Sequence, residues 1–171
     1  MKRTNWFDRK FSPIEDNGIL PCIIERLEGT PARLAEKMKQ INKASLSVSK
    51  NHKWSIKREI GHLIDLEPLW LERAKEIIAG EPDLKKADLT NSKTQEADHD
   101  AREVTALVTD FSTHRQYLVQ LLRALKDTDL DRSSKHPRLG TPMKIIDLAY
   151  FVAEHDDHHL AQITFLQNSI Q

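Results

Sequence analysis

The stretch that decides the fold is Ile145-Ile146-Asp147-Leu148-Ala149-Tyr150-Phe151-Val152-Ala153-Glu154-His155-Asp156-Asp157-His158-His159-Leu160-Ala161-Gln162-Ile163-Thr164-Phe165-Leu166. Apolar residues recur in it every three or four positions, which is typical of one face of an α-helix. These residues are Ile145, Leu148, Val152, Ile163 and Leu166. His155 and His159 continue the same face, where leucine or valine would be expected, so the pattern predicts that both rings point inward.

The spacing of this histidine pair suits a metal ion. Residues four apart on a helix have Cβ atoms about 5–6 Å apart, so two imidazoles can converge on one ion. A lone inward histidine is usually a core residue that a neighbour satisfies. Two in phase are harder to explain this way, because each ring needs a donor and an acceptor and an apolar face offers neither. The sequence therefore predicts one divalent metal ion per chain.

A third ligand is expected from a facing helix, and His62 is the preferred candidate. It lies near Leu66 and Leu69 on the flank of the second predicted helix, whereas His158 falls at the edge of its own face. His114, on the flank of the third helix, is a weaker candidate. The remaining histidines fall in predicted loops and are expected to be solvated: His52, His99 and His136. Three neutral imidazoles leave coordination positions open, as in catalytic metal sites.

Three further helices complete an all-α fold, predicted to be an up-down four-helix bundle. The first helix is expected from Asn17 to about Ile41, with a kink or break at Gly29-Thr30-Pro31. The second is expected from an N-cap at Ser55 to Ala79, with Gly80 after it. The third is expected from about Asp100 to Lys126, and the fourth begins at Thr141-Pro142. Strand signals are nearly absent, and residues 1–171 are interpreted as a single domain.

The segment between the second and third helices, residues 81–99, is polar and has no helical period. Loops of this length within compact domains are usually functional or disordered. Two interpretations remain open, a lid over a site and a solvated excursion without a role.

Composition excludes several functions. Lys+Arg and Asp+Glu number 26 each, so the chain has no basic excess for binding nucleic acid. It contains no run of about 18 apolar residues, so no membrane span is expected. The polar N-terminus and the single Cys22 predict a cytoplasmic protein without disulfides. Cys22 is expected to be a buried, inert thiol on a face with Ile19 and Ile23.

Arg115 is a second anomaly, because it falls near the centre of the apolar stripe of the third helix. An unpaired charge there would be costly, so a carboxylate partner is expected, with Asp65, Glu67 and Asp156 as candidates. Either Arg115 forms a structural ion pair or its guanidinium binds a carboxylate of the substrate. Asp65 lies one turn from His62 and could also accept the second N–H of a ligating imidazole.

Three segments carry a resemblance to a known family: Trp54-Ser55-Ile56, Gly61-His62-Leu63-Ile64-Asp65, and Glu154 to Ile163 with its histidine pair. The chain resembles the DinB/YfiT-like superfamily of metal-binding four-helix bundles from about Trp6 to Ile163. The resemblance implies a three-histidine site at His62, His155 and His159, with zinc or nickel bound. The family's label "damage-inducible" describes expression and does not imply DNA binding.

The resemblance also implies competing functions for a small-molecule substrate. Many members are described as metal-dependent hydrolases, in which the site would activate a water. Some relatives instead use the metal to activate a low-molecular-weight thiol for transfer or isomerisation; a thiol with carboxylates would need a basic pocket, which Arg115 with Arg58 or Arg73 could supply. The third hypothesis is a non-catalytic bundle in which any metal is structural.

A homodimer is predicted from surplus large apolar side chains, Trp6, Phe7, Phe11 and Trp70. The resemblance implies frequent dimers. The alternative is that the N-terminal aromatic residues fold back over the bundle of their own chain.

Overall fold

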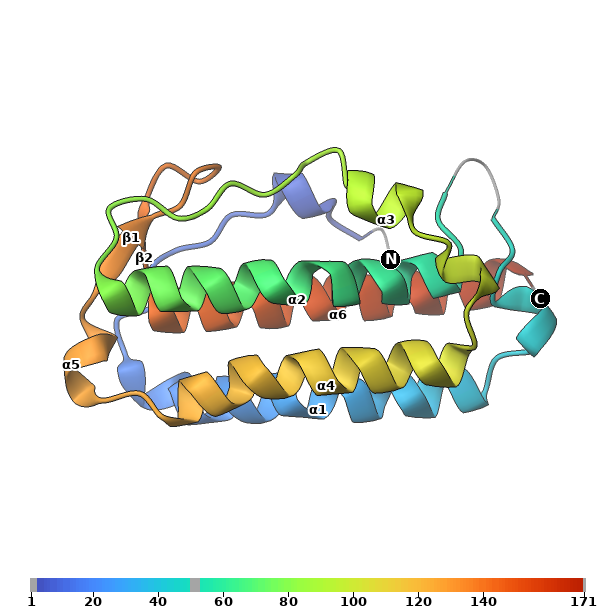
Figure 1. The fold of residues 1–171 in the computed structure, drawn as a ribbon, viewed down its shortest axis with the longest axis horizontal. Helices are drawn as coiled ribbons and strands as arrows, with labels where there is room; N and C mark the ends of the chain where they lie inside the picture. The colour runs from blue at the N-terminus through green and yellow to red at the C-terminus, as the bar shows by residue number, and fades with distance from the viewer. Residues whose placement is uncertain (1–2, 50–52, 171) are drawn as a thin grey trace.

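Four long helices pack around a common core in the computed structural model, which describes residues 3–49 and 53–170 (Figure 1). They are α1 (Leu20–Lys39), α2 (Ile56–Ala79), α4 (Val104–Arg123) and α6 (Ile145–Ile170). The all-α four-helix bundle predicted from the sequence is confirmed. α2 begins and ends as expected, since the Ser55 hydroxyl accepts from the Arg58 amide and Gly80 adopts a left-handed conformation with φ 77°.

The order of the helices around the bundle is less simple than their order in the chain. Both α4 and α6 pack against α1 and against α2, so α1 and α2 lie diagonally. In Figure 1, α2 and α4 both begin at the right-hand end, because the connection after α2 runs back along the bundle. Consecutive helices therefore alternate in direction from α1 to α2 and from α4 to α6, but α2 and α4 are parallel. A loop without periodicity does not indicate its own path, so the sequence could not predict this crossover.

The crossover connection is partly structured. It contains α3 (Ser92–Glu96) and the 3-10 helix η4 (His99–Ala101), and both contact α2. Because residues 99–101 form η4, the third long helix begins at Val104 and not at about Asp100.

A small antiparallel hairpin precedes the last helix, although strands were not expected. Its strands are β1 (Ser133–Lys135) and β2 (Pro142–Lys144), with Ser134 opposite Met143. The last helix therefore begins at Ile145 and not at Thr141-Pro142. The remaining short elements are η1 (Trp6–Asp8), η2 (Asn17–Ile19), η3 (Lys43–Ser45) and α5 (Asp127–Leu130).

α1 continues through Gly29-Thr30-Pro31, so a break there was a wrong expectation. Pro31 has no N–H, which leaves the carbonyl of Leu27, one turn earlier, without its helical donor. The buried guanidinium of Arg115 donates to that carbonyl, with Nη1 3.4 Å from the oxygen. A tertiary contact thus replaces the missing helical hydrogen bond.

The N-terminal segment lies along α6. Arg3 donates to the carbonyl of His158, Arg9 pairs with Glu154 at 3.1 Å, and the ring of Trp6 packs edge-on against that of Phe151. This is the arrangement in which the N-terminal aromatic residues fold back on their own chain. The dimer remains a prediction.

Two further sequence-based expectations concern exposure. Cys22 is exposed on α1, so its predicted burial is wrong; the neighbouring Ile23 and Ile24 take the core positions. Among the described residues, no helix is both long and apolar enough to cross a membrane.

Candidate metal centre

Three histidines converge between α2 and α6. One ring nitrogen from each of His62, His155 and His159 lies within 4.8 Å of the others, and all three residues are buried. His62 comes from α2, and α6 supplies the pair four residues apart. The structure thus brings together the three ligands predicted from helical spacing.

The geometry of the pair on α6 fits a shared ion. The Nε2 atoms of His155 and His159 are 3.1 Å apart. Two nitrogens bound tetrahedrally to zinc at about 2.0–2.1 Å would be about 3.3 Å from each other, close to this separation. His155 Nδ1 is buried and has no hydrogen-bond partner among the described residues. The donor set therefore suits a divalent metal ion that accepts imidazole ligands.

The carboxyl group of Glu59 orients His159. Nδ1 of His159 lies 2.6 Å from Glu59 Oε2, and with the ring proton on Nδ1 the Nε2 atom keeps its lone pair. Carboxylate contacts of this kind fix the tautomer of ligating histidines in metal sites. Sequence reasoning missed Glu59, although it lies three residues before His62, where a helix places both side chains on neighbouring parts of one surface.

A hydroxyl holds His62 in the same way. Its Nδ1 lies 3.3 Å from Thr94 Oγ1, and this hydroxyl donates to Asp65 Oδ2 at 2.9 Å. Asp65 was a candidate for direct contact with His62, but Thr94 from α3 lies between them. Thr94 was not identified from the sequence because its segment has no periodicity.

His99 is buried with only 4% exposure, so its expected solvation is wrong. Its Nε2 lies 2.9 Å from Asp65 Oδ2, and its ring lies against the backbone of Gly61. A Cβ atom at position 61 would come within 2.3 Å of this ring, so only glycine allows the contact. A glycine inside a helix was the available signal for such a close approach.

Burial keeps the three imidazoles neutral. It lowers the pKa of His62 to about 3, with a further contribution from His159, and the pKa of His159 to about 4. The pKa of His155 is also well below its ordinary value, first because of burial. Burial raises the pKa of Glu59 to about 8. At pH 7 each of the three rings can therefore offer a lone pair to an ion.

The other histidines have different environments. His158 faces the same cavity, but it is not part of the converging group, as its place at the edge of the helical face predicted. His114 lies away from the site and its Nδ1 is 2.8 Å from the Asp110 carbonyl. His136 is 2% exposed, which corrects its predicted solvation. His52 lies outside the described residues.

The converging histidines line a cavity of about 390 Å³. Its walls come from α2, α6, the N-terminal segment, the crossover connection and the turn between β1 and β2. Aromatic side chains form much of the wall: Trp6, Phe7, Trp54, Trp70 and Phe151. Residues 86–89 and Asn91 close one side, so the crossover connection takes part in the site. Such a cavity suits a small organic molecule.

Arg115 lies outside this cavity in a buried ionic cluster. Its guanidinium pairs with Glu67 at 2.5 Å and with both carboxylate oxygens of Asp156. Burial alone would lower the pKa of Arg115, but the two carboxylates raise it above its ordinary value. Two of the three predicted partners are thus found, and Asp65 is not among them. With all its nitrogens bonded, Arg115 has the geometry of the predicted structural ion pair.

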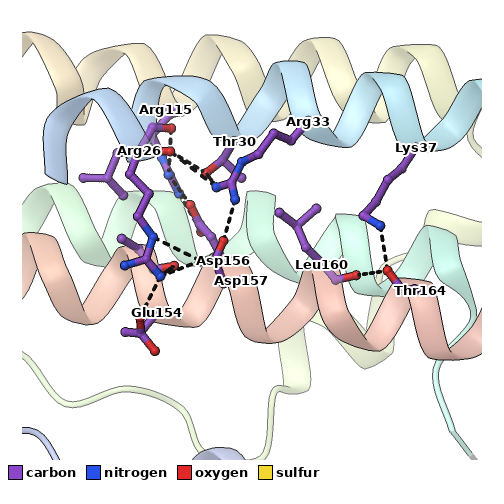
Figure 2. A network of polar contacts seen from close by, with 12 residues as sticks. Arg26, Thr30, Arg33, Lys37, Arg115, Glu154, Asp156, Asp157, Leu160 and Thr164 are labelled. Atoms are coloured by element: carbon purple, nitrogen blue, oxygen red, sulfur yellow. Dashed lines mark hydrogen bonds and ion pairs between the residues drawn. The ribbon is translucent and has the colours of Figure 1, made fainter. Parts of the chain in front are cut away.

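Figure 2 shows Arg115 and Asp156 of this cluster beside a second polar network that joins α1 to α6. Arg26 binds Glu154 and Asp157, and Arg33 binds Asp157 at 2.7 Å. The acidic residues around the histidine pair therefore face basic residues of α1. Glu154 and Asp157 are thus paired with arginines and do not belong to the converging histidine group.

The sequence of residues 26–163 matches the profile of the DinB superfamily. The chain belongs to this superfamily. A proposed metal-dependent hydrolase of Oceanobacillus iheyensis is 28% identical over 144 residues, which cover 84% of this chain and 83% of that protein. The resemblance noted from the sequence is thereby confirmed for the family.

Solved structures show the same fold. YfiT from Bacillus subtilis, described as a probable metal-dependent hydrolase with an unusual four-helix bundle topology, superposes with a TM-score of 0.80 at 21% identity over 95% of both chains. A mycothiol-dependent maleylpyruvate isomerase superposes with a TM-score of 0.65 at 11% identity, covering 92% of this chain and 62% of the isomerase. At these identities the likeness concerns the fold alone.

Proposed function

We propose that the protein is a metal-dependent hydrolase acting on a small molecule, with one zinc or nickel ion per chain held by His62, His155 and His159. The observation that carries this proposal is the convergence of three buried, neutral imidazoles at the wall of a cavity. When bound, such an ion lowers the pKa of a water molecule and so supplies a nucleophile at neutral pH.

The chain's own residues prepare this site. Glu59 and Thr94 each hold a second ring nitrogen, so His159 and His62 direct Nε2 inward in one tautomer. The aromatic walls exclude water from a substrate and offer apolar surface for its body. A rigid, preoriented site of this kind needs little reorganisation when a ligand binds.

Elemental analysis of protein purified without a metal-affinity step tests the ligand assignment. We expect about one zinc or nickel per chain, several-fold less in His159→Ala, and an unchanged helical spectrum. His114→Ala is the matched control, because His114 lies on α4 outside the site. Full metal occupancy in His159→Ala would refute the assignment. Loss of folding together with the metal would identify a structural site.

Hydrolysis is tested with a panel of aryl esters and the metal-loaded protein. Turnover should depend on the metal, disappear in His159→Ala and persist in His114→Ala. Equal turnover by wild type and His159→Ala would assign the activity to a contaminant or to another site.

A second candidate is metal-assisted transfer or isomerisation with a low-molecular-weight thiol. Of the three arginines considered for binding a thiol's carboxylates, Arg73 lines the cavity, whereas Arg115 and Arg58 pair elsewhere with Glu67 and Asp100. Metal-dependent conjugation of a thiol to an electrophile, without ester hydrolysis, would favour this reaction. A protein that retains its metal but shows neither activity would favour the non-catalytic bundle.

We also propose a homodimer, although fewer aromatic side chains are available for its interface than the sequence indicated. Trp70 is buried, and Trp6 and Phe11 pack against the core of their own chain, so of the four aromatic residues only the exposed Phe7 is left to support an interface. Light scattering should give twice the chain mass of 19.7 kDa. A mass near that of one chain across a wide concentration range would exclude the dimer.

A further inference from the structure

The cavity has a second end, which is lined by two arginines; Glu76 raises the pKa of one of them, Arg73, without forming an ion pair with it in the described part of the chain. Arg73 and Arg138 both line the cavity, and neither forms an ion pair within residues 3–49 and 53–170. Arg73 is buried, and Arg138 is half-buried with one buried nitrogen. Buried charges in proteins are normally paired, because removing a charge from water without giving it a partner is costly. The excess of positive charge at this end therefore needs an explanation.

Arg73 is only 2% exposed and is fixed by neutral groups. Nε and Nη2 donate to the carbonyl of Lys85 at 2.9 and 2.7 Å, and Nη1 lies 3.1 Å from His136 Nε2. Burial lowers the pKa of Arg73 to about 10; Glu76 opposes this shift, and Arg138 adds to it. The side chain is still charged at neutral pH, and its rotamer is fixed before any ligand arrives.

Arg138 lies in the turn between β1 and β2, between two aromatic rings. Its guanidinium carbon is 5.4 Å from the ring centre of Phe7 and 5.8 Å from that of Phe151. Such stacking leaves the edge of the guanidinium free to donate. Nη2 is buried and has no hydrogen-bond partner in the part of the chain that the structure describes.

The other charged residues that line the cavity form no ion pair with the two arginines in the described part of the chain. Lys86 adds a third cation to the lining. Asp88 is the acidic lining residue, but its carboxylate already accepts four hydrogen bonds from the amides and hydroxyls of Thr90 and Ser92. These bonds lower the pKa of Asp88 and keep the carboxylate within its own turn.

An aromatic ring connects this end to the histidine end. The ring centre of Trp70 is 5.5 Å from that of His155 and 5.5 Å from the guanidinium carbon of Arg73. Phe151 extends the same wall, with its ring 5.9 Å from Trp70 and 5.3 Å from His136. The cavity thus has imidazoles at one end, guanidiniums at the other, and an apolar span of about one aromatic side chain between them.

We propose that the ligand of this cavity carries an oxyanion, a carboxylate or a phosphate, which binds Arg138 and Arg73 while the reacting group lies at the histidines. This inference rests on the proposed function, since it assigns the substrate class of the same site. An ionised oxygen supplies the acceptor that Arg138 Nη2 lacks, and guanidinium geometry matches the two oxygens of such a group. The apolar part of the ligand lies against Trp70 and Phe151.

Binding of simple probes tests the assignment without turnover. Phenylpropionate, phenethyl phosphate and the neutral phenylpropionamide are titrated into the protein as purified, with calorimetry as the readout. We expect the two anions to bind and the amide to bind at least about tenfold more weakly, because hydrogen bonds to charged groups are the stronger ones. The tighter of the two anions identifies the oxyanion. Equal affinity for phenylpropionamide and phenylpropionate would overturn the proposal.

Arg138→Gln should weaken anion binding at least about tenfold and leave binding of the amide unchanged. Arg138→Lys, which keeps the charge but loses the planar fork, should bind the anions with intermediate affinity. Arg123→Gln is the matched control, because Arg123 pairs with Glu25 and Glu28 on the surface and should bind as wild type does. Thermal unfolding of each variant checks that the fold is intact. Wild-type anion affinity in a folded Arg138→Gln variant would refute the proposal.

Titration before and after metal removal separates this inference from the proposed function. Anion binding that depends on Arg138 in the metal-free protein supports the oxyanion site by itself. Binding that is lost with the metal but insensitive to Arg138→Gln would place the anion at the histidines and refute the inference. A protein that never holds metal but binds anions through Arg138 would refute the proposed function and support the inference.

Discussion

Arg115 and Arg138 are two arginines beside the same bundle core, and they differ in what surrounds the guanidinium. Arg115 contacts the carboxylates of Glu67 and Asp156, and its remaining N–H groups are also bonded. Arg138 lies near two aromatic rings and has a buried nitrogen without a hydrogen-bond partner among the described residues. The first arrangement is complete within the chain, whereas the second lacks an acceptor.

We infer from this difference that Arg115 stabilises the fold, whereas Arg138 is available to bind a ligand. Removing one member of a buried ion pair leaves an uncompensated charge, so a complete cluster is costly to break. Removing an unpaired cation leaves no such charge behind. The histidine cluster belongs with the incomplete group, because His155 Nδ1 is buried without a hydrogen-bond partner among the described residues and three ring nitrogens converge beside it. The following predictions probe this contrast, beginning with the largest effect.

Replacing the paired arginine should cause the largest loss of stability. Arg115→Met leaves Glu67 and Asp156 buried without a cation, so we expect the free energy of unfolding to fall by about 3–5 kcal/mol. Denaturant unfolding at pH 7 measures the change. Arg123→Met, which removes only exposed ion pairs with Glu25 and Glu28, should have little effect. Equal losses in both variants would contradict the contrast.

In protein treated with a chelator to remove metal, the pH dependence of the free energy of unfolding should come from the buried histidines. His62 and His159 have pKa values near 3 and 4 when folded, against about 6.5 in the unfolded chain, so the unfolded state takes up protons first as the pH falls. The contribution of each neutral ring to the free energy of unfolding is therefore fully present above pH 6.5. It decreases by about 1.4 kcal/mol per pH unit as the pH falls from 6.5 to the pKa of that ring in the folded protein. Glu59 acts in the opposite sense, because its pKa is raised to about 8.

Unfolding of chelated wild type and His62→Asn between pH 7.5 and 5 tests this contribution. As the pH falls below 6.5, the free energy of unfolding of the variant should decrease less steeply, by about 1.4 kcal/mol per pH unit, because the variant has one titrating ring fewer. Because the folded protein keeps its imidazoles neutral in this range, its metal affinity, measured by competition with a chelator, should change little down to pH 5. A metal affinity that falls steeply through pH 6.5 would show that the rings are not held neutral.

The contact behind His62 should have a moderate effect on metal binding. Thr94→Val removes the hydroxyl between His62 and Asp65 but keeps the shape of the side chain. We expect metal affinity to fall about tenfold, as for other groups that orient ligating histidines. Thr113→Val on α4 is the control, since its exposed hydroxyl donates to the carbonyl of Thr109 within its own helix. An unchanged affinity in Thr94→Val would mean that this contact does not position the ligand.

The smallest change in stability is expected at the unpaired arginine. Arg138→Gln removes the stacking against Phe7 and Phe151 but breaks no ion pair, so the free energy of unfolding should change by less than about 1 kcal/mol. Thermal and denaturant unfolding measure it beside Arg115→Met. A loss comparable to that of Arg115→Met would mean that Arg138 has a structural partner, and the comparison would fail.

Helical periodicity explains what could be predicted of the site. His155 and His159 repeat in phase with Val152 and Ile163, and Arg115 interrupts an apolar stripe, so their inward direction follows from spacing alone. The family resemblance and the spacing agreed on His62. Two of the three partners proposed for Arg115 were also found, because few carboxylates occupy inward positions.

Other parts of the site depend on contacts that no periodic pattern encodes. Thr94 and His99 reach the metal centre because the crossover connection folds back onto α2, and His136 and Arg138 reach the cavity because a short hairpin turns toward α6. Each of these residues lies in a segment without a helical repeat. The glycine at position 61 was the local sign that another side chain approaches the helix.

The Arg115 cluster also fixes how far the four long helices can slide along one another. It joins one residue from each long helix: Leu27 of α1, Glu67 of α2, Arg115 of α4 and Asp156 of α6. Apolar stripes tolerate sliding, since leucine packs against leucine after a shift, but a slip of one turn moves a side chain by about 5.4 Å and takes a carboxylate out of reach of the guanidinium. Because Asp156 adjoins His155, the alignment that satisfies Arg115 also sets His62 level with the histidine pair.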